Sequence, residues 1–222
     1  MKFRILCSVP DVHVSVNQDN PDDVIISVHP TSSLTLEECN AGDIVKIGNR
    51  EYLIVDRRVN GCPVLITTKP VTKMSFGNSN NFLHSDVKVF CEEVFGKEYR
   101  DAVMGHGFVI TDLQADDGTY FKDSDGEEQF NYSSCASIPS TSFYRKYRKV
   151  LSAIDVSGAV TSTAVTTTEH SDAICVICRD GILSWSLPSN QQEVFCVVSP
   201  LPNTRVQLMS RYSDQSADKT DV

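Results

Sequence analysis

Short apolar runs with alternating polar residues dominate the chain and predict strands. The pattern is clearest near the N-terminus, where Val12, Val14 and Val16 alternate with polar residues. This period of two is typical of a half-buried strand. Similar runs predict further strands, and the full set lies at residues 3–7, 12–16, 24–28, 43–47, 50–55, 61–67, 173–178, 182–187, 194–198 and 205–209.

Two segments carry the helical period instead. In the first, Ser85 is the expected N-cap, and apolar residues recur at the spacing of one helix face until Gly96, where we expect the helix to end. The second spans residues 140–154. Its expected inward face is Phe143, Tyr147, Val150, Leu151 and Ile154.

The order of these elements is strands, then two helices with long loops, then strands again. It predicts an α+β fold rather than alternating β-α-β units. We expect an N-terminal β arm or small β module at 1–40, one main domain at 41–209 and a polar tail at 210–222. Residues 157–171 contain eight Ser or Thr and no helical period, so they are expected to form a loop.

Composition excludes several classes of protein. The 222 residues carry a net charge of −9 and 41% apolar residues, which is ordinary for a globular chain and works against binding a phosphate backbone. No apolar run approaches the ~20 residues of a membrane helix. We therefore expect no nucleic-acid partner and no membrane insertion. The basic and apolar start is interrupted at Ser8 and Pro10 and is interpreted as a strand, not an export signal.

The eight cysteines lie mostly within apolar runs, which is typical of buried thiols in a reducing compartment. Cys175 and Cys178 match C-x-x-C, but the motif lies in a predicted strand and has no second pair, so two core cysteines are the favoured interpretation.

The acidic turns Asp116-Asp117-Gly118 and Asp123-Ser124-Asp125-Gly126 do not fit the spacing of an EF-hand loop. An irregular calcium site within 116–128 stays an alternative to ordinary turns. No metal and no cofactor are expected.

Other candidate chemistry is similarly weak. The basic run Arg145–Lys149 is interpreted as the solvated face of a helix. Gly105-His106-Gly107 is interpreted as a turn, and no nucleophile, phosphate-loop or metalloprotease motif is present. The chain is therefore expected not to be an enzyme. Trp185, the single tryptophan, is expected to be buried; if it were exposed, it would suggest a ligand platform.

Four segments carry a resemblance to a known family. They are Gly42–Gly48 with Tyr52–Asp56; residues 64–67, a polar loop with Asn80, and 87–95; the run Ser142-Phe143-Tyr144-Arg145-Lys146-Tyr147-Arg148; and residues 174–187 with 194–198. Together they resemble an uncharacterised family of C-type-lectin-like domains found largely in bacteriophage proteins and in surface proteins of Gram-positive bacteria. The likeness covers about residues 42–208. The family's paired-Trp motif is absent, because residues 158–163 read Gly-Ala-Val-Thr-Ser-Thr.

The resemblance implies a non-catalytic display or adhesion domain with a mixed or antiparallel sheet and two helices. It implies a structural or accessory protein of a phage virion, on the tail, baseplate or capsid surface, assembled in the host cytoplasm. The expected partners are other virion proteins and a host surface glycan or protein, in a homo-oligomer or larger assembly. The ligand surface is expected on the loops 77–81, 116–126 and 157–171, with Asn78, Asn80, Asn81, Tyr132 and Trp185 as candidate residues.

Two other functions stay open. One is an intracellular protein whose acidic surface binds a basic host factor. The other, less favoured, is a thiol or metal enzyme that uses Cys175 and Cys178.

Overall fold

The computed structural model describes residues 12–20, 23–30, 33–57, 61–98, 106–114, 128–134, 136–166, 172–179 and 181–211. The strand expected at 3–7, the acidic turns at 116–126 and the polar tail from 212 onward lie outside the described residues. Among the described residues, no helix combines the length and the apolar character needed to cross a membrane.

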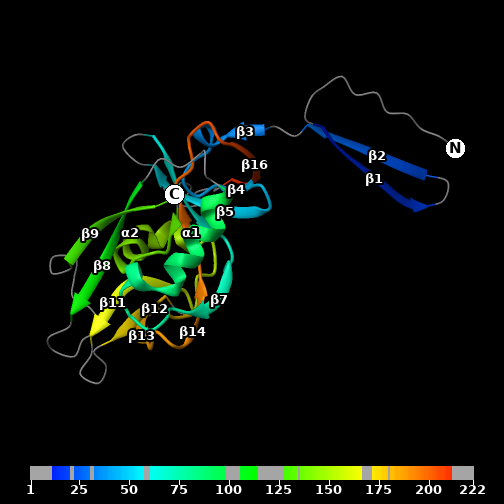
Figure 1. The fold of residues 1–222 in the computed structure, drawn as a ribbon. Coiled ribbons are helices and arrows are strands. Elements are labelled where there is room, and N and C mark those ends of the chain that lie inside the picture. Colours follow the sequence, from blue (N-terminus) through cyan, green and yellow to red (C-terminus); the bar gives the residue numbers. More distant parts are fainter. Residues whose placement is uncertain are drawn as a thin grey trace, which may run out of the picture.

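A seven-stranded antiparallel sheet forms the centre of the body (Figure 1). Its order is β10 (Ala136–Ser137), β15 (Val197–Val198), β6 (Pro63–Thr67), β5 (Arg50–Arg57), β4 (Ile44–Ile47), β16 (Arg205–Ser210) and β3 (Ser33–Thr35). β4 and β5 form the expected hairpin, and Gly48 in its turn has a positive φ of 58°. β3 and the following 3-10 turn η1 (Leu36–Glu38) belong to this body, because β3 pairs with β16 and Leu36 is buried.

A second sheet of five strands has the order β13 (Leu183–Ser186), β12 (Ala173–Ile177), β11 (Val160–Thr166), β8 (His106–Gln114) and β9 (Glu128–Ser134). Only the pair β8 and β11 is parallel in it. β7 (Thr72–Ser75) pairs with β14 (Gln191–Val194) in a separate two-stranded sheet. The fold is therefore α+β, as expected from the order of the elements.

Both predicted helices are present, α1 (Asp86–Glu98) and α2 (Thr141–Leu151). Each begins where a serine hydroxyl accepts a backbone N–H of the first turn: Ser85 from Lys88 at 3.1 Å, and Ser140 from Phe143 at 3.0 Å. The 3-10 turn η2 (Phe82–His84) precedes α1. The expected end of α1 at Gly96 was wrong, because the helix continues through it to Glu98.

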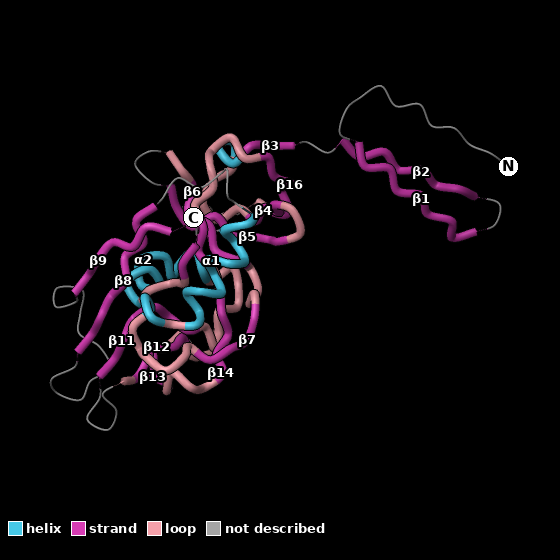
Figure 2. Tube along the Cα trace, viewed as in Figure 1, coloured by secondary structure: helices cyan, strands magenta, loops and turns pink. Residues whose placement is uncertain are grey.

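The central sheet has a hydrophobic core on each face. Along β5, Tyr52 and Ile54 belong to one core and Leu53 and Val55 to the other, as the alternation of a strand requires. The first core contains the buried stripe of α1, and the second contains the buried residues of α2. Figure 2 shows the two helices on the body among the strands.

Three expectations about the second sheet and its neighbours were wrong. Residues 160–166 are not a loop but the middle strand β11, in which Thr161 and Thr163 are buried. Their hydroxyls are satisfied by hydrogen bonds, Thr161 to the Cys175 carbonyl at 2.9 Å and Thr163 to Thr141 at 3.1 Å. A β-branched polar residue can therefore occupy a buried strand. His106 begins β8 rather than a turn, and the run at 194–198 is divided between β14 and β15.

The inward face of α2 contains the expected residues. Leu151 is buried in the second core, and Phe143, Tyr147, Val150 and Ile154 pack against it half-buried. Tyr144, which the sequence pattern did not include, is buried as well. Phe143 and Tyr147 also contact each other edge to face, with their ring centroids 4.8 Å apart.

The N-terminal strands β1 (Val12–Asn20) and β2 (Asp23–Pro30) form an antiparallel hairpin that is a sheet of its own. Figure 1 draws this hairpin outside the body. Its register pairs apolar with apolar residues at alternate positions: Val12 with Pro30, Val14 with Val28, and Val16 with Ile26. The positions that alternate with these pair His13 with His29, Ser15 with Ser27, and Asn17 with Ile25.

Candidate functional site

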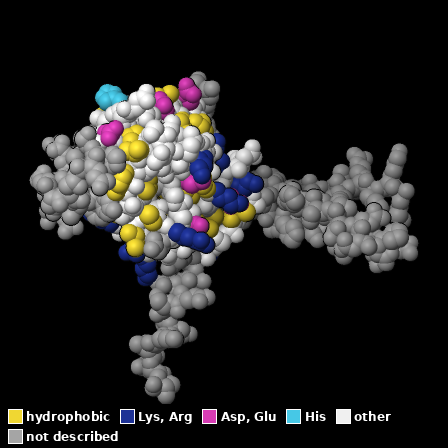
Figure 3. All heavy atoms as spheres, turned by 90° about the horizontal axis from the view of Figure 1, so that it is seen from below, with side chains coloured by type: hydrophobic (Ala, Val, Ile, Leu, Met, Phe, Trp, Pro, Cys, Tyr) yellow, Lys and Arg dark blue, Asp and Glu magenta, His cyan; other side chains and the backbone are white. Residues whose placement is uncertain are grey.

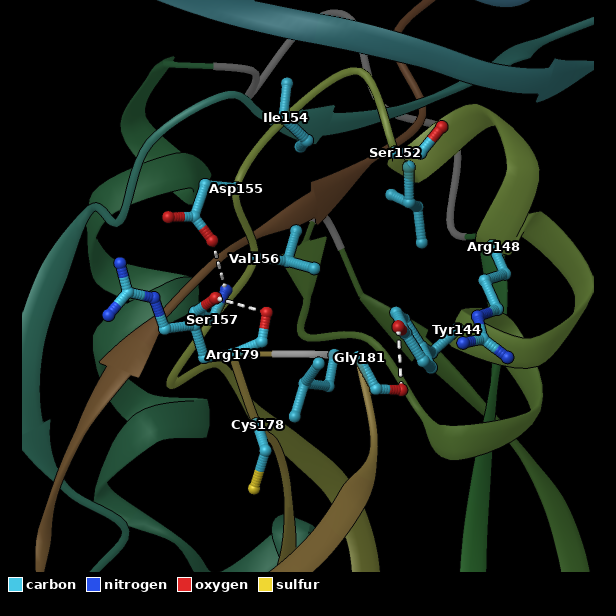
Figure 4. A pocket seen from close by; sticks show the side chains of 12 residues that line it. Tyr144, Arg148, Ser152, Ile154, Asp155, Val156, Ser157, Cys178, Arg179 and Gly181 are labelled. Carbon is cyan, nitrogen blue, oxygen red and sulfur yellow. Dashed lines mark hydrogen bonds between the residues drawn. The ribbon is translucent and has the colours of Figure 1, made fainter.

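A pocket of about 290 Å³ opens where three segments of the body meet (Figure 4). They are the C-terminal end of α2, the turn at 154–157 that follows it, and the turn at 178–181 between β12 and β13. The deep side is apolar, because Leu151, Val156 and Ile177 are buried there. The rim is polar and charged, with Arg148, Asp155 and Arg179 on it.

A single hydrogen bond holds two of these segments together. Tyr144 is buried at the base of α2 and donates its hydroxyl to the Gly181 carbonyl at 3.0 Å. Gly181 has φ +74°, and a Cβ added there would lie 2.5 Å from the Tyr144 hydroxyl oxygen. A residue with a side chain cannot occupy this position without moving Tyr144, so glycine is needed for the shape of the pocket.

The turn at 154–157 is fixed by Asp155 and Ser157. The Ser157 backbone N–H donates to Asp155 Oδ1 at 2.9 Å, and the Ser157 hydroxyl donates to the Arg179 carbonyl at 3.5 Å. Hydrogen bonds from the Ser157 side chain and backbone, together with the charge of Arg179, hold the pKa of Asp155 below its ordinary value. Asp155 is therefore an exposed carboxylate that stabilises the turn through Oδ1.

Two arginines provide the positive charge of the rim. Arg148 comes from α2 and Arg179 from the β12–β13 turn, and both side chains are exposed. Arg148 makes no ion pair or side-chain hydrogen bond with any residue that the structure describes. Because an exposed guanidinium can pair with a carboxylate or phosphate, Arg148 is a candidate contact for an anionic ligand.

Among the described residues, the lining of this pocket includes Ser157 and Cys178 as potential nucleophiles and no histidine. Figure 4 shows the Cys178 sulfur directed away from Asp155 and Ser157. Within the described residues, no group of three or more His, Cys, Asp or Glu side chains is arranged to hold a metal ion.

Cys175 and Cys178 occupy different environments in the structure. Cys175 is fully buried in β12, and Cys178 is half-buried just beyond the end of that strand. Neither forms a disulfide bond with another described residue.

The three asparagines expected on a ligand surface lie on the loop between β7 and α1. Asn80 donates its side-chain amide to the Ala173 carbonyl at 3.3 Å, which connects this loop to β12. Asn81 caps η2, because its side chain accepts the Leu83 backbone N–H at 2.9 Å. Asn78 is exposed and makes no side-chain hydrogen bond with the described residues.

The two aromatic candidates lie on the second sheet. Trp185 is half-buried in β13, opposite Cys175, and packs against the second core. Tyr132 lies in β9 opposite Phe108, and its side chain is outside the described part. None of the candidates lines the pocket of Figure 4.

The pocket residues were missed because they are distant in sequence. Gly181 lies between the predicted strands at 173–178 and 182–187, and Arg148 lies in the basic run of the second predicted helix, but nothing in either segment indicates that they meet. The requirement for glycine at 181 was the one local signal, and many turns carry it.

A second, shallower pocket of about 240 Å³ lies between the β4–β5 hairpin and the loop after β6. Lys46, Arg50 and Lys69 line it with Glu51, and Arg50 lies over the Phe95 ring with 5.1 Å to the centroid. Figure 3 shows Lys and Arg side chains gathered on the face that it draws, with a few acidic side chains among them. Local positive charge therefore occurs on a chain whose net charge is −9.

The structure is that of an α+β protein with a small, polar-rimmed pocket. Comparison with protein-family models, with curated proteins and with solved structures finds no match. The function of the chain must therefore be argued from its own residues.

Proposed function

We propose that the chain is a non-enzymatic structural or accessory protein of a bacteriophage particle, in which the body is a C-type-lectin-like display module and the N-terminal hairpin attaches it to a neighbouring protein of the particle. The phage assignment rests on the resemblance of residues 42–208. The α+β body with two helices and mostly antiparallel sheets is consistent with it.

The observation that carries the proposal is the register of the hairpin. Apolar residues meet apolar residues at Val12, Val14 and Val16, so one face of the ladder consists of apolar positions. A two-stranded hairpin by itself is marginally stable in water. Because β1 and β2 pair with no other strand among the described residues, a partner protein that packs on these apolar positions would stabilise the hairpin.

The pocket supports a display role for the body. Its volume suits a ligand of about the size of a monosaccharide, since drug-sized ligands occupy roughly 300–1,000 Å³. Arg148 and Arg179 favour a ligand with a carboxylate. We therefore propose that the pocket receives the acidic sugar of a host surface glycan.

Attachment is tested by adding purified variants to particles that lack the protein and measuring the fraction that sediments with them. Val14→Asp should abolish co-sedimentation, because it places a charge among the apolar positions. Ser15→Asp is the matched control on the opposite positions and should co-sediment like the unsubstituted chain. Equal co-sedimentation of both variants would overturn the role of the hairpin. If the unsubstituted chain and Ser15→Asp self-associate and Val14→Asp does not, the partner of the hairpin is a second copy of this chain.

The pocket is tested with methyl glucuronide, and methyl glucoside is the neutral control. Binding followed by NMR should be seen for the acidic sugar alone, and Arg148→Ala should weaken it by roughly tenfold. Lys149→Ala, on the same helix but outside the pocket, should leave it unchanged. If neither sugar binds, or if both bind equally well, the proposed ligand class is wrong. The attachment experiment does not depend on this result.

The acidic net charge also suits the alternative of a cytosolic host-factor inhibitor. Such a protein would remain in the soluble lysate instead of co-sedimenting with particles. The first experiment therefore separates the two.

A further inference from the structure

Two cysteines from distant parts of the chain meet in the core beneath α1. The Sγ atoms of Cys91 and Cys196 lie 3.4 Å apart, although the residues are separated by 105 positions in the sequence. Both side chains are fully buried in the first core. A disulfide bond requires the sulfurs to approach to about 2 Å, so the pair needs a displacement of little more than an ångström.

Each sulfur is held in place by its own element. Cys91 lies in the middle of the buried stripe of α1, between Val87 and Phe95. Cys196 is fixed against the end of β6: its N–H donates to Thr67 Oγ1 at 3.1 Å, and its carbonyl accepts the Thr67 N–H at 3.0 Å. The two thiols therefore face each other because α1 packs on the sheet.

We propose that Cys91 and Cys196 are an oxidation site that forms a disulfide bond and fastens α1 to the central sheet. The oxidant is a peroxide small enough to enter the core. One thiol loses its proton, and the thiolate attacks a peroxide oxygen; the O–O bond breaks, the sulfur becomes a sulfenic acid, and the leaving hydroxide takes up the thiol proton as the first water. The second sulfur then attacks the sulfenic sulfur, the S–O bond breaks, and the hydroxyl leaves with the second thiol proton as another water. Two S–H bonds are lost, one S–S bond forms, and one hydrogen peroxide is reduced to two waters.

This inference stands on the core geometry and is independent of the proposed ligand and of attachment to a particle. It does give a particle protein a specific advantage. A chain that folds with free thiols in a reducing cytoplasm becomes cross-linked after release into an oxidising medium. Closing so long a loop restricts the unfolded chain strongly.

The test uses the full-length reduced protein treated with hydrogen peroxide under native conditions. Peptide mapping should show a Cys91–Cys196 link, with the loss of two hydrogen atoms from the intact mass, and the melting temperature should rise by about 10 °C. Cys91→Ala should lose both the link and the rise. Cys178→Ser, which removes a half-buried thiol outside this core, should keep both.

Three results would overturn the inference. The first is that both thiols stay free after prolonged treatment of the folded protein. The second is that links join Cys91 or Cys196 to other cysteines instead. The third is that the link forms only in denaturant. If Cys91→Ala fails to fold, the peptide map of the unsubstituted protein decides alone.

Discussion

Tyr147 on α2 donates its hydroxyl to the carboxylate of Asp56 on β5, and Lys146 approaches the same carboxylate at 3.2 Å. This contact joins the second helix to the central sheet across 91 positions of sequence. Burial acts to raise the pKa of Asp56, but hydrogen bonds from Tyr147, the Arg57 backbone and Lys146 outweigh it, so the pKa lies below its ordinary value.

The Asp56 contact should make stability depend on acid pH. A carboxyl group whose pKa is lowered by folding stabilises above its unfolded value of about 3.9, and this contribution is lost as the pH falls toward the folded pKa. The side chain retains 37% exposure, so solvent screening keeps the effect small. Asp56→Asn should lower the free energy of unfolding by about 1 kcal/mol at pH 7, and this loss should shrink as the pH falls below ~4.

Urea unfolding at several pH values measures this difference. Glu37→Gln, at an exposed carboxylate, is the control and should match the unsubstituted chain throughout. If Asp56→Asn lowers the free energy of unfolding by the same amount from pH 7 to pH 3, the charge of Asp56 does not stabilise the fold.

Gly181 and Gly61 offer a matched pair of substitutions. Both have positive φ, +74° and +80°, so alanine should cost about 1 kcal/mol of backbone strain at either position. A Cβ at 61 meets nothing within 4 Å, whereas at 181 it meets the Tyr144 hydroxyl. Gly181→Ala should therefore be the more destabilising of the two in thermal unfolding.

The clash itself is tested by removing the hydroxyl. Tyr144→Phe in the Gly181→Ala background should recover part of the loss, which a double-mutant cycle measures as a coupling energy. Equal losses at 61 and 181, or no coupling with Tyr144, would contradict the contact across the pocket.

Asn78 and Asn81 lie on the same loop but should contribute differently to the stability of the fold. Asn81→Ala removes the cap of η2 and should lower stability by about 1 kcal/mol. Asn78→Ala should stay within about 0.5 kcal/mol, as for an ordinary surface position. Chemical denaturation of both variants gives the comparison, and a larger loss at 78 than at 81 would refute this division.

Ser162 is expected to behave unusually for a buried polar residue. Its side chain is buried in β11, and its hydroxyl has no hydrogen-bond partner among the described residues. Because an unpaired buried hydroxyl opposes folding, Ser162→Ala should leave stability unchanged or increase it by about 1 kcal/mol. Thr163→Val is the contrast and should be destabilising, since its hydroxyl accepts the Thr141 N–H at 3.0 Å. Calorimetry that shows a loss in Ser162→Ala would mean that the hydroxyl has a partner.

Local patterns predicted the elements well where the buried residues are apolar. The Ser85 cap and the apolar spacing that follows it located the start of α1, and continuous apolar runs located β5 and β12, whose central residues are buried on both faces. The pattern failed at β11, because a run rich in Ser and Thr looks polar in sequence. Its burial depends on acceptors such as the Cys175 carbonyl, which tertiary structure supplies.

The candidate site could not be predicted from the sequence for the same reason. Arg148 and Gly181 approach only because Tyr144 connects their segments. The contact between Cys91 and Cys196 likewise depends on how α1 packs on the sheet. Both are long-range relationships that no local spacing encodes.

Quantitative mass spectrometry of purified particles, compared with the soluble lysate, tests the central claim most directly. The account predicts that peptides of this chain co-purify with particles at a fixed ratio to the capsid protein, and that Val14→Asp moves them to the lysate while Ser15→Asp does not. Peptides that stay in the lysate for the unsubstituted chain would contradict the claim that this is a particle protein.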